Sequence, residues 1–267
     1  MISVTILTKN SARTLADTLV ALQDFPEVLI CDTGSTDTTL EIAKRFPNVR
    51  VVSHPLEGFG PTHNLASSLA THDWILSIDS DEIVSPELAT SIRSLPLDHS
   101  AVYSLDRHNY FNGKRMKFCA GWHPDPVCRL YHRQKTHFSS DAVHEKVLTH
   151  NLAVIPLPGP LFHTPYRDVS HLLEKMIHYS TLFAKERAGY KHSSPARALG
   201  HALVAFFKNY ILKKGFLGGK EGLILSLHNT LMTYFKYLLL WQENQKLLQE
   251  KNAKKEPLPP PQTSAGP

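Results

Sequence analysis

The chain has 267 residues, of which 42% are hydrophobic, and it carries a formal net charge of +5. This length allows a sizeable core and fits one domain of roughly 200–250 residues followed by a tail. The moderate basic excess favours an anionic partner, such as a nucleotide diphosphate or an acidic membrane surface. The sequence shows no aromatic-plus-basic signature of RNA binding, so we expect no nucleic-acid partner.

The three cysteines, Cys31, Cys119 and Cys128, are odd in number and lack the spacing of a metal site. This pattern argues against a disulfide framework and predicts a reducing compartment. The first apolar run begins directly after Met1 and ends by Lys9, which is too short for the hydrophobic region of a secretory signal. We therefore expect a cytoplasmic protein.

The first hundred residues alternate short β-branched runs with helix-like stretches, which is typical of βαβ units and a parallel sheet. The predicted strands are Ile2–Leu7, Val28–Cys31, Val49–Val52 and Trp74–Ile78. Apolar residues at helical spacing predict two helices: Leu15, Leu19 and Leu22 after a cap at Ser11, and Leu40, Ala43 and Phe46 after Thr36. Ser85 followed by Pro86 is typical of the start of a third helix.

Polar residues end each predicted strand, at Thr8–Asn10, Asp32–Ser35, His54 and Asp79–Glu82. The carboxyl ends of parallel strands line the ligand crevice of an open α/β sheet. The sequence therefore predicts a binding site at this edge. Residues 101–154 are irregular and rich in aromatics and histidine, which predicts the part that receives a second substrate; strands are expected at 102–105 and near 129 and 147.

Helices are expected to dominate the C-terminal part of the chain. Asp168–Gly189 predicts an amphipathic helix, and Ser194–Pro195 predicts the start of another. We expect an α/β catalytic domain over residues 1–165, a helical extension over 166–245 and a charged, then Pro-rich, disordered tail over 246–267.

Three carboxylates crowd the segment Asp79-Ser80-Asp81-Glu82, directly after an apolar strand. Such carboxylates repel one another unless a cation or a donor network offsets their charge. A hard divalent ion, Mg²⁺ or Mn²⁺, would do so and would also bridge a substrate diphosphate. The alternative is a solvated acidic turn that caps the next helix.

Asp32 also lies at the carboxyl end of a strand, before a glycine turn. A carboxylate there can accept the N3–H of a uracil ring, a donor that cytosine lacks, so it could both bind and select a base. Thr36 and Asp37, which follow the turn, are better explained as helix caps.

Taken together, these segments resemble glycosyltransferase family 2 of the GT-A fold. The resemblance rests on Val4–Asn10, the Asp32–Asp37 turn, His63-Asn64, Asp79–Glu82, Arg107–Lys117, Gly121–Asp125, Arg129-Leu130, Val143–Glu145 and Lys214–Gly222. The chain is most similar to the bacterial enzymes that add glucose to the inner-core heptose of lipopolysaccharide. The set in its order is more specific than any single motif.

The resemblance implies a role for each matching residue. It places Thr8, Asn10, Asp32, Asn64, Asp79 and Arg129 against the nucleotide sugar, with Asp32 on the uracil and Asp79 on the ribose. It makes Asp79, Asp81 and His163 the metal site. On the acceptor side it points to Trp122, Asp125 and His144. Thr33 stands where a second aspartate is common in the family, and the usual Glu-Asp pair is absent, so Glu145 becomes the expected base.

Four of these side chains also have a simpler explanation. Glu145 could be a surface strand residue, and Arg129 could pair with a local carboxylate. His163 could be structural in a chain with 16 histidines, and Trp122 could be a core residue. The Gln-x-x-Arg-Trp segment of processive synthases is missing, so polymer synthesis is not expected.

The apolar stretch Gly222–Trp241 is long enough to span a bilayer, but His228, Asn229 and Lys236 interrupt it. An interfacial helix fits better, with Leu223, Leu227, Leu231, Tyr234 and Leu238 toward lipid and the lysines at 208, 213, 214 and 220 near anionic headgroups. The alternative is a helical hairpin that closes the catalytic core or forms a dimer.

The expected activity is inverting, metal-dependent transfer of a hexose, with glucose favoured, from a UDP-sugar to a lipid-linked saccharide, the lipopolysaccharide inner core. Such an enzyme would associate peripherally with the inner face of the bacterial inner membrane. Two alternatives stay open. The same fold could act on a polyprenyl phosphate, a surface polysaccharide or a protein, or it could bind a nucleotide sugar without catalysis.

Overall fold

The computed structural model describes residues 1–119, 122–140 and 145–253. The chain divides into two compact units, and each is described separately. The sheet unit consists of residues 1–117 and 121–165, and the helical unit consists of residues 118–120 and 166–267. His144, one of the predicted acceptor-side residues, lies outside the described residues.

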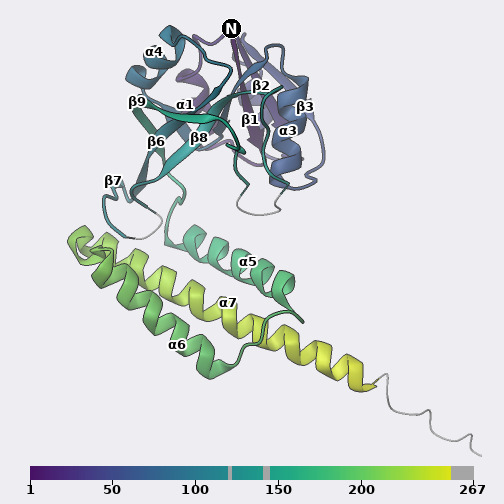
Figure 1. Ribbon diagram of the computed structural model, residues 1–267, viewed down its shortest axis with the longest axis vertical. Coiled ribbons are helices and arrows are strands. Elements are labelled where there is room, and N and C mark those ends of the chain that lie inside the picture. The colour runs from purple at the N-terminus through teal and green to yellow at the C-terminus, as the bar shows by residue number, and fades with distance from the viewer. Residues whose placement is uncertain (120–121, 141–144, 254–267) are drawn as a thin grey trace, which may run out of the picture. The chain divides into compact units, whose positions relative to one another are not determined.

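The described part of the sheet unit is built on one mixed sheet (Figure 1). Its strands are β1 (Ile2–Thr8), β2 (Glu27–Asp32), β3 (Val49–Ser53), β4 (Trp74–Asp79), β5 (Glu82–Val84), β6 (Ala101–Phe111), β7 (Lys114–Arg115), β8 (Pro126–His132) and β9 (Ala153–His163). They are arranged in the order β3-β2-β1-β4-β8-β6-β9-β5, and β7 pairs with β6. The first four strands in this order are parallel, whereas β8 runs antiparallel to both β4 and β6.

Helices cover both faces of this sheet. They are α1 (Leu15–Val20), α2 (Thr39–Ala43), α3 (Phe59–Leu69) and α4 (Pro86–Ser94). Side chains alternate between the faces along each strand, so Val28 and Ile30 of β2 join the core formed with α1 and α4. Leu29, between them, packs in a second core that includes Tyr131 and Phe138. The mixed α/β fold with a mostly parallel central sheet is thus confirmed.

Local capping explains where the helices begin. Ser85 accepts a hydrogen bond from Leu88 N at 3.1 Å and Pro86 occupies the first helical position, as predicted. Thr36 does not cap α2; the Asp37 carboxylate instead accepts from Thr39 N at 3.0 Å. Ser11 contributes only its backbone carbonyl to the first turn of α1, because its hydroxyl bonds to Ser80.

The second half of the sheet unit differs more from expectation. Val147 forms only an isolated bridge with Phe138 instead of a strand. The eleven-residue strand β9 was not predicted, because Pro156, Pro158 and Pro160 lie within it and proline removes ladder donors. β9 nevertheless pairs with β6 on one side and β5 on the other, and it ends at His163.

The helical unit contains α5 (Val169–Arg187), α6 (Pro195–Phe206), the π-helical turn η1 (Phe207–Leu212), the 3₁₀ turn η2 (Gly215–Gly218) and α7 (Gly219–Ala253). Asp168 and Ser194 cap α5 and α6. α5 and α6 both pack along α7. α7 continues eight residues past 245, where the sequence predicts a tail. In the described ranges, no helix combines the length and apolarity needed to cross a membrane.

Candidate active site

The carboxyl ends of β1 and β2 form one polar cluster around Asp32. Thr8 Oγ1 donates to Asp32 Oδ1 at 2.9 Å, and the Ser35 hydroxyl donates to the same oxygen. Asp32 Oδ2 accepts from the backbone amides of Gly34 and Ser35, at 3.1 and 2.9 Å. Burial raises the pKa of Asp32, but these four donors outweigh it, so the net pKa is lowered and the group is ionised.

Asp32 is therefore saturated with hydrogen bonds in this structure, and it is 2% exposed. A uracil N3–H would have to replace one of the four donors, because two carboxylate oxygens offer about four acceptor positions. The base contact stays a prediction. The structure gives Asp32 another task, which is to fix the turn after β2.

Asn10 links the loop after β1 to this turn. Its backbone has a φ of 53°, a left-handed conformation that asparagine tolerates. Asn10 Oδ1 accepts from Thr36 N at 2.8 Å, and Asn10 N donates to the Ser35 hydroxyl at 2.9 Å. Thr8, Asn10 and Asp32 thus lie together at the edge of the sheet where the sequence predicts nucleotide binding.

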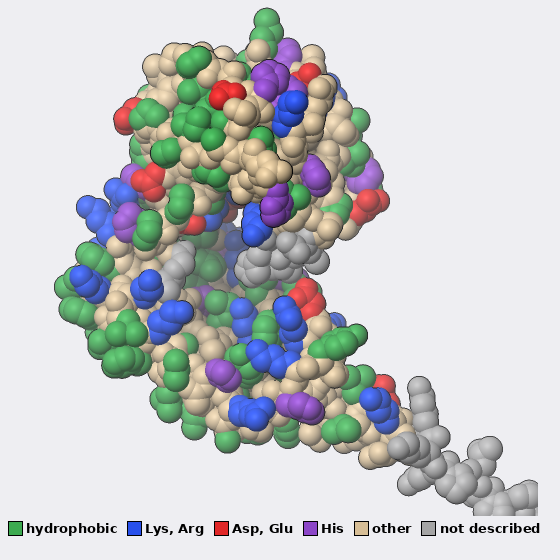
Figure 2. Space-filling model, viewed as in Figure 1, with side chains coloured by type: hydrophobic (Ala, Val, Ile, Leu, Met, Phe, Trp, Pro, Cys, Tyr) green, Lys and Arg blue, Asp and Glu red, His purple; other side chains and the backbone are tan. Residues whose placement is uncertain are grey.

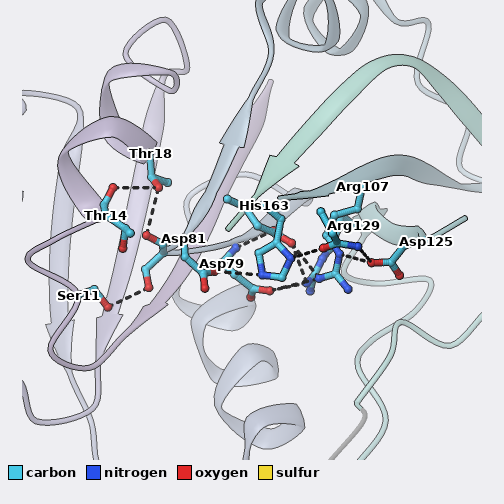
Figure 3. A network of polar contacts seen from close by, with 12 residues as sticks. Ser11, Thr14, Thr18, Asp79, Asp81, Arg107, Asp125, Arg129 and His163 are labelled. Atoms are coloured by element: carbon cyan, nitrogen blue, oxygen red, sulfur yellow. Dashed lines mark hydrogen bonds and ion pairs between the residues drawn. The ribbon is translucent and has the colours of Figure 1, made fainter. Parts of the chain in front are cut away.

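The acidic turn between β4 and β5 is organised by Glu82, which has no exposed surface. Its Oε2 accepts from Asp79 N at 3.0 Å, and its Oε1 accepts from Arg107 Nη1 at 3.0 Å. Arg129 Nη2 lies 3.5 Å from the same Oε1 and donates to Asp79 Oδ2 at 2.6 Å. One buried carboxylate therefore holds the guanidinium groups of Arg107 and Arg129 in place. Figure 3 shows these two arginines near Asp79 and Asp125.

These contacts set the charge states of Asp79 and Arg129. Burial raises the pKa of Asp79, but the charge of Arg129 and of other nearby cations outweighs it and lowers the pKa from 3.8 to about 2. Burial lowers the pKa of Arg129, and the carboxylates of Asp79, Glu82 and Glu145 more than reverse that, so the net pKa is raised. Both groups therefore stay charged, and the Asp79 carboxylate stays bound to the guanidinium group of Arg129.

Asp81 directly follows Ser80, which is held by hydrogen bonds, and its carboxylate faces His163. Ser80 is held by two residues near the start of the chain: its hydroxyl bonds to Ser11 Oγ at 2.8 Å and its carbonyl accepts from Thr18 Oγ1 at 3.1 Å. Asp81 Oδ1 then lies 3.7 Å from His163 Nε2. Figure 3 shows these two side chains near each other. The predicted pair of Asp81 and His163 is brought together by the fold.

The cluster carries more negative than positive charge. Asp79, Asp81, Glu82 and Asp125 give four negative charges, whereas Arg107 and Arg129 give two positive ones, so the formal sum is −2. Within the described residues, no three His, Cys, Asp or Glu side chains form a cluster able to hold a metal alone. Asp81 and His163 fit a Mg²⁺ or Mn²⁺ ion that takes its other ligands from phosphate or water, as such ions commonly do.

The remaining predicted residues have mixed positions. Glu145 is half-buried, and its carboxylate acts electrostatically on Arg129, so it belongs to the same site. Trp122 is 6% exposed and packs edge-on against Phe111, which leaves little ring surface for a sugar. Sugar stacking on Trp122 therefore stays a prediction that requires the ring to be uncovered. Asp125 Oδ2 accepts from Arg107 Nε and from Asn109 Nδ2, both at 2.8 Å.

Asn64 uses its amide to hold a loop. Its Nδ2 donates to Phe138 O at 3.0 Å, and its Oδ1 accepts from Phe138 N at 2.8 Å. A Cβ at Gly60, one turn earlier in α3, would fall 1.8 Å from the Ser139 carbonyl oxygen. The predicted contact of Asn64 with the nucleotide sugar stays a prediction, since both ends of its amide are occupied here.

Sequence reasoning did not assign a role to Glu82, Arg107 or Asn109. Glu82 stood in the acidic motif and Arg107 began one of the segments that carry the family resemblance, so a signal existed for both. Asn109 lies in the same segment, but its role could not be foreseen, because that role depends on β6 and β9 being neighbours, and β9 was not predicted.

Several known proteins are similar to this chain in sequence or in fold. Residues 3–119 match the family described as Glycosyl transferase family 2. An uncharacterized glycosyltransferase of Rickettsia felis is 27% identical over 94% of this chain and 92% of its own length. Another, from Rickettsia conorii, is 26% identical over the same shares. A mannosyltransferase of Pyrobaculum calidifontis has a similar structure, with a TM-score of 0.50 and 17% identity over 91% of this chain and 86% of that one.

The fold of the sheet unit is therefore GT-A, and residues 3–119 are similar to glycosyl transferase family 2. The protein is a glycosyltransferase. The mannosyltransferase was solved in complex with GDP-Man and Mn²⁺.

Replacing Glu82 tests whether this carboxylate organises the site. Glu82→Gln leaves two guanidinium groups short of one buried counter-charge, and we expect a loss of roughly 3–5 kcal/mol in the free energy of unfolding of the sheet unit. Urea unfolding followed by tryptophan fluorescence in a Trp241→Phe background measures it, because Trp74 and Trp122 then report on the sheet unit alone.

Asp106→Asn is the matched control, because its side chain is 53% exposed and pairs only with His108 among the contacts seen. It should cost no more than about 1 kcal/mol. Equal stability of Glu82→Gln and Asp106→Asn would contradict the assigned role of Glu82.

Proposed function

We propose that the protein is an inverting, metal-dependent hexosyltransferase that uses a UDP-sugar, with glucose as the transferred sugar. The acceptor in this proposal is a lipid-linked saccharide, the inner core of lipopolysaccharide. The observation that supports metal dependence most directly is the net charge of −2 around Asp79, Asp81, Glu82 and Asp125, with Asp81 and His163 facing each other at 3.7 Å.

A divalent ion is supported by the chemistry of these donors. A carboxylate oxygen and an imidazole nitrogen are both ligands that Mn²⁺ accepts, and carboxylates suit Mg²⁺. Asp81 and His163 would hold the ion, and Asp79 would contact the ribose or the metal only after loosening its bond to Arg129. When bound, such an ion supplies charge stabilisation for the departing diphosphate. The Mn²⁺ bound to the Pyrobaculum calidifontis mannosyltransferase supports the same proposal.

Inversion requires one carboxylate to take the proton of the acceptor hydroxyl. Glu145 is our proposed base, because it is half-buried and its charge already acts on Arg129 within the site. Asp125 is less suitable for that task, since its Oδ2 is held by Arg107 and Asn109.

The proposals that the donor nucleotide contains uracil and that the acceptor is a lipid-linked saccharide have less direct support. Asp32 lies where the family resemblance places the uracil, and the turn that it fixes puts Thr8 and Asn10 beside it. A polyprenyl phosphate, a surface polysaccharide or a protein acceptor would suit the same fold. Retention of Asp79, Asp81 and Glu145 argues against a purely binding role.

The exposed surface of α6, η1 and η2 supports a lipid-bound partner. Six apolar side chains there are more than half exposed: Leu199, Leu203, Val204, Phe207, Leu212 and Leu217. Residues 195–218 include four basic side chains and no acidic one. Figure 2 shows hydrophobic and basic side chains intermixed at the end of the helical unit where α6 leads into α7, at the left of the view. Such a surface suits an anionic bilayer interface.

This surface differs from the one that the sequence suggested. Leu223, Leu227 and Leu231 of α7 are 39–44% exposed, less than the apolar residues of α6, because α7 also packs against α5 and α6. We propose that α6, η1 and η2 provide the membrane contact and that the protein acts peripherally at the inner face of the bacterial inner membrane.

Asp81→Asn tests the metal site. The amide removes one negative charge and weakens the ligand set, so Mn²⁺-dependent binding of UDP should fall at least about tenfold while the circular-dichroism spectrum stays that of the wild type. Isothermal titration with and without Mn²⁺ measures it. CDP and GDP serve as comparison ligands, and equal binding of all three nucleotides would remove the support for uracil selection. Unchanged Mn²⁺-dependent binding by Asp81→Asn would place the metal elsewhere.

Glu145→Gln tests the base, because glutamine has nearly the same shape but cannot accept the proton. We expect near-normal affinity for UDP-glucose and turnover reduced by ~10²-fold or more. The measurement is UDP release in the presence of truncated lipopolysaccharide. Glu87→Gln, an exposed carboxylate in the first turn of α4, is the control and should turn over normally. Wild-type turnover in Glu145→Gln would assign the base to another residue.

Leu203→Glu tests the membrane surface. The change removes an apolar contact and adds a charge that anionic lipid repels, so partition to vesicles of phosphatidylglycerol should fall at least about tenfold. Ile177→Glu is the matched control, because Ile177 is 61% exposed but lies on α5. Sedimentation with anionic and with neutral vesicles, at low and high salt, measures both. Wild-type protein that stays in the supernatant with anionic vesicles at low salt would argue for a protein partner instead.

A further inference from the structure

His163 is the last residue of β9 and is held between two neighbouring strands. In the register of the sheet it pairs with Asn109 of β6 on one side and with Glu82 of β5 on the other. Its two ring nitrogens have different surroundings. Nδ1 lies 2.6 Å from Asn109 Oδ1, and Nε2 lies 3.7 Å from Asp81 Oδ1. Which nitrogen bears the hydrogen decides what His163 can offer to Asp81.

The orientation of the Asn109 amide follows from its other contacts. Asn109 is 3% exposed, and its Nδ2 lies 3.0 Å from the backbone carbonyl oxygen of Trp122 and 2.8 Å from Asp125 Oδ2. A backbone carbonyl can only accept, so the group facing it must be the NH₂ of the amide. The amide oxygen therefore faces His163, and a flipped amide would place two acceptors against each other.

The orientation of Asn109 in turn fixes the histidine. An amide oxygen has no hydrogen to donate, so Nδ1 of His163 must donate to it. A neutral imidazole carries one N–H, which leaves Nε2 with a free lone pair directed toward Asp81. A metal-binding histidine commonly donates its other ring N–H to an acceptor, and that hydrogen bond orients the ring in this way.

The support for Asn109 extends further into the sheet. The Asp125 carboxylate that accepts from Asn109 also accepts from Arg107 Nε at 2.8 Å, and Arg107 Nη1 donates to the buried Glu82 at 3.0 Å. Glu82, Arg107, Asp125 and Asn109 thus form a continuous series of hydrogen bonds that ends at His163. The series ties the ring to the same carboxylate that positions Arg129.

We propose that Asn109 is a positioning residue that holds neutral His163 in the Nδ1–H tautomer, so that the Nε2 lone pair and the Asp81 carboxylate face one cation. The part concerning the cation rests on the proposed function, whereas the tautomer does not. The same contacts give Asp125 the task of orienting Asn109, which is separate from its predicted place on the acceptor side.

The tautomer is measured in metal-free protein labelled with ¹⁵N-histidine at pH 8, with the His163 signals assigned by comparison with His163→Gln. The wild type should show a protonated Nδ1 and an unprotonated Nε2. Asn109→Leu removes the acceptor and should shift the ring toward the Nε2–H form. Asn48→Leu, which removes an amide that bonds to the loop after α1, should leave the His163 signals unchanged.

Mn²⁺ titration of the same proteins provides the second measurement. Asn109→Leu should bind Mn²⁺ about 10–100-fold more weakly than the wild type, and Asn48→Leu should bind it equally well. An Nε2–H ring in the wild type, or the same tautomer in the wild type and in Asn109→Leu, would overturn the proposal. An Nδ1–H ring in a wild-type protein that binds no Mn²⁺ would support the positioning role and contradict the metal dependence proposed above.

Discussion

The Glu82 carboxylate, on the short strand β5 that directly follows the acidic turn after β4, is fully buried, and an isolated charge there would be very costly. The cost is offset by Arg107 from β6 and Arg129 from β8, and the backbone amide of Asp79 satisfies its other oxygen. These bonds place the two arginines, and each arginine then holds an aspartate. The positions of Asp79 and Asp125 therefore both follow from the need to neutralise one buried group.

In this arrangement the acidic residues of the turn between β4 and β5 have different partners. Asp79 and Glu82 are neutralised by arginines, whereas the carboxylate of Asp81 faces His163. A second cluster, around Asp32, satisfies its carboxylate with neutral donors instead. The two clusters lie at the carboxyl ends of β2 and β4. In the first cluster neutral donors, including backbone amides, bind the carboxylate, and in the second charged arginines do so.

The parallel half of the sheet could be predicted because each of its strands is a short apolar run with a polar end. The residues 2–7, 28–31, 49–52 and 74–78 all proved to be strands within one or two residues. The positions of Asp32, Asp79 and Asp81 in the fold could be predicted for the same reason, since each lies at or just past the end of a strand. The helix cap at Ser85 could also be predicted, because it depends only on adjacent residues.

The other half required information that no local pattern contains. β9 includes three prolines, so its pairing with β6 and β5 overrides its poor strand propensity. Without β9, the contact of Asn109 with His163 could not be foreseen. The exposure of α6 depends in the same way on which face of α7 it covers, and α7 itself extends to Ala253 through a charged stretch that sequence alone suggested was unstructured.

Gly60 has a consequence of a different kind. Its α-carbon lies so close to the Ser139 carbonyl that even alanine would push the two segments apart, and Asn64 holds the same loop through Phe138. The loop comes shortly before Glu145 in the chain. An alanine at position 60 would therefore displace the loop at Ser139 while leaving every ionised side chain of the site in the sequence. Geneticists seeking conditional alleles of this enzyme would find such glycine positions more useful than the acidic residues themselves.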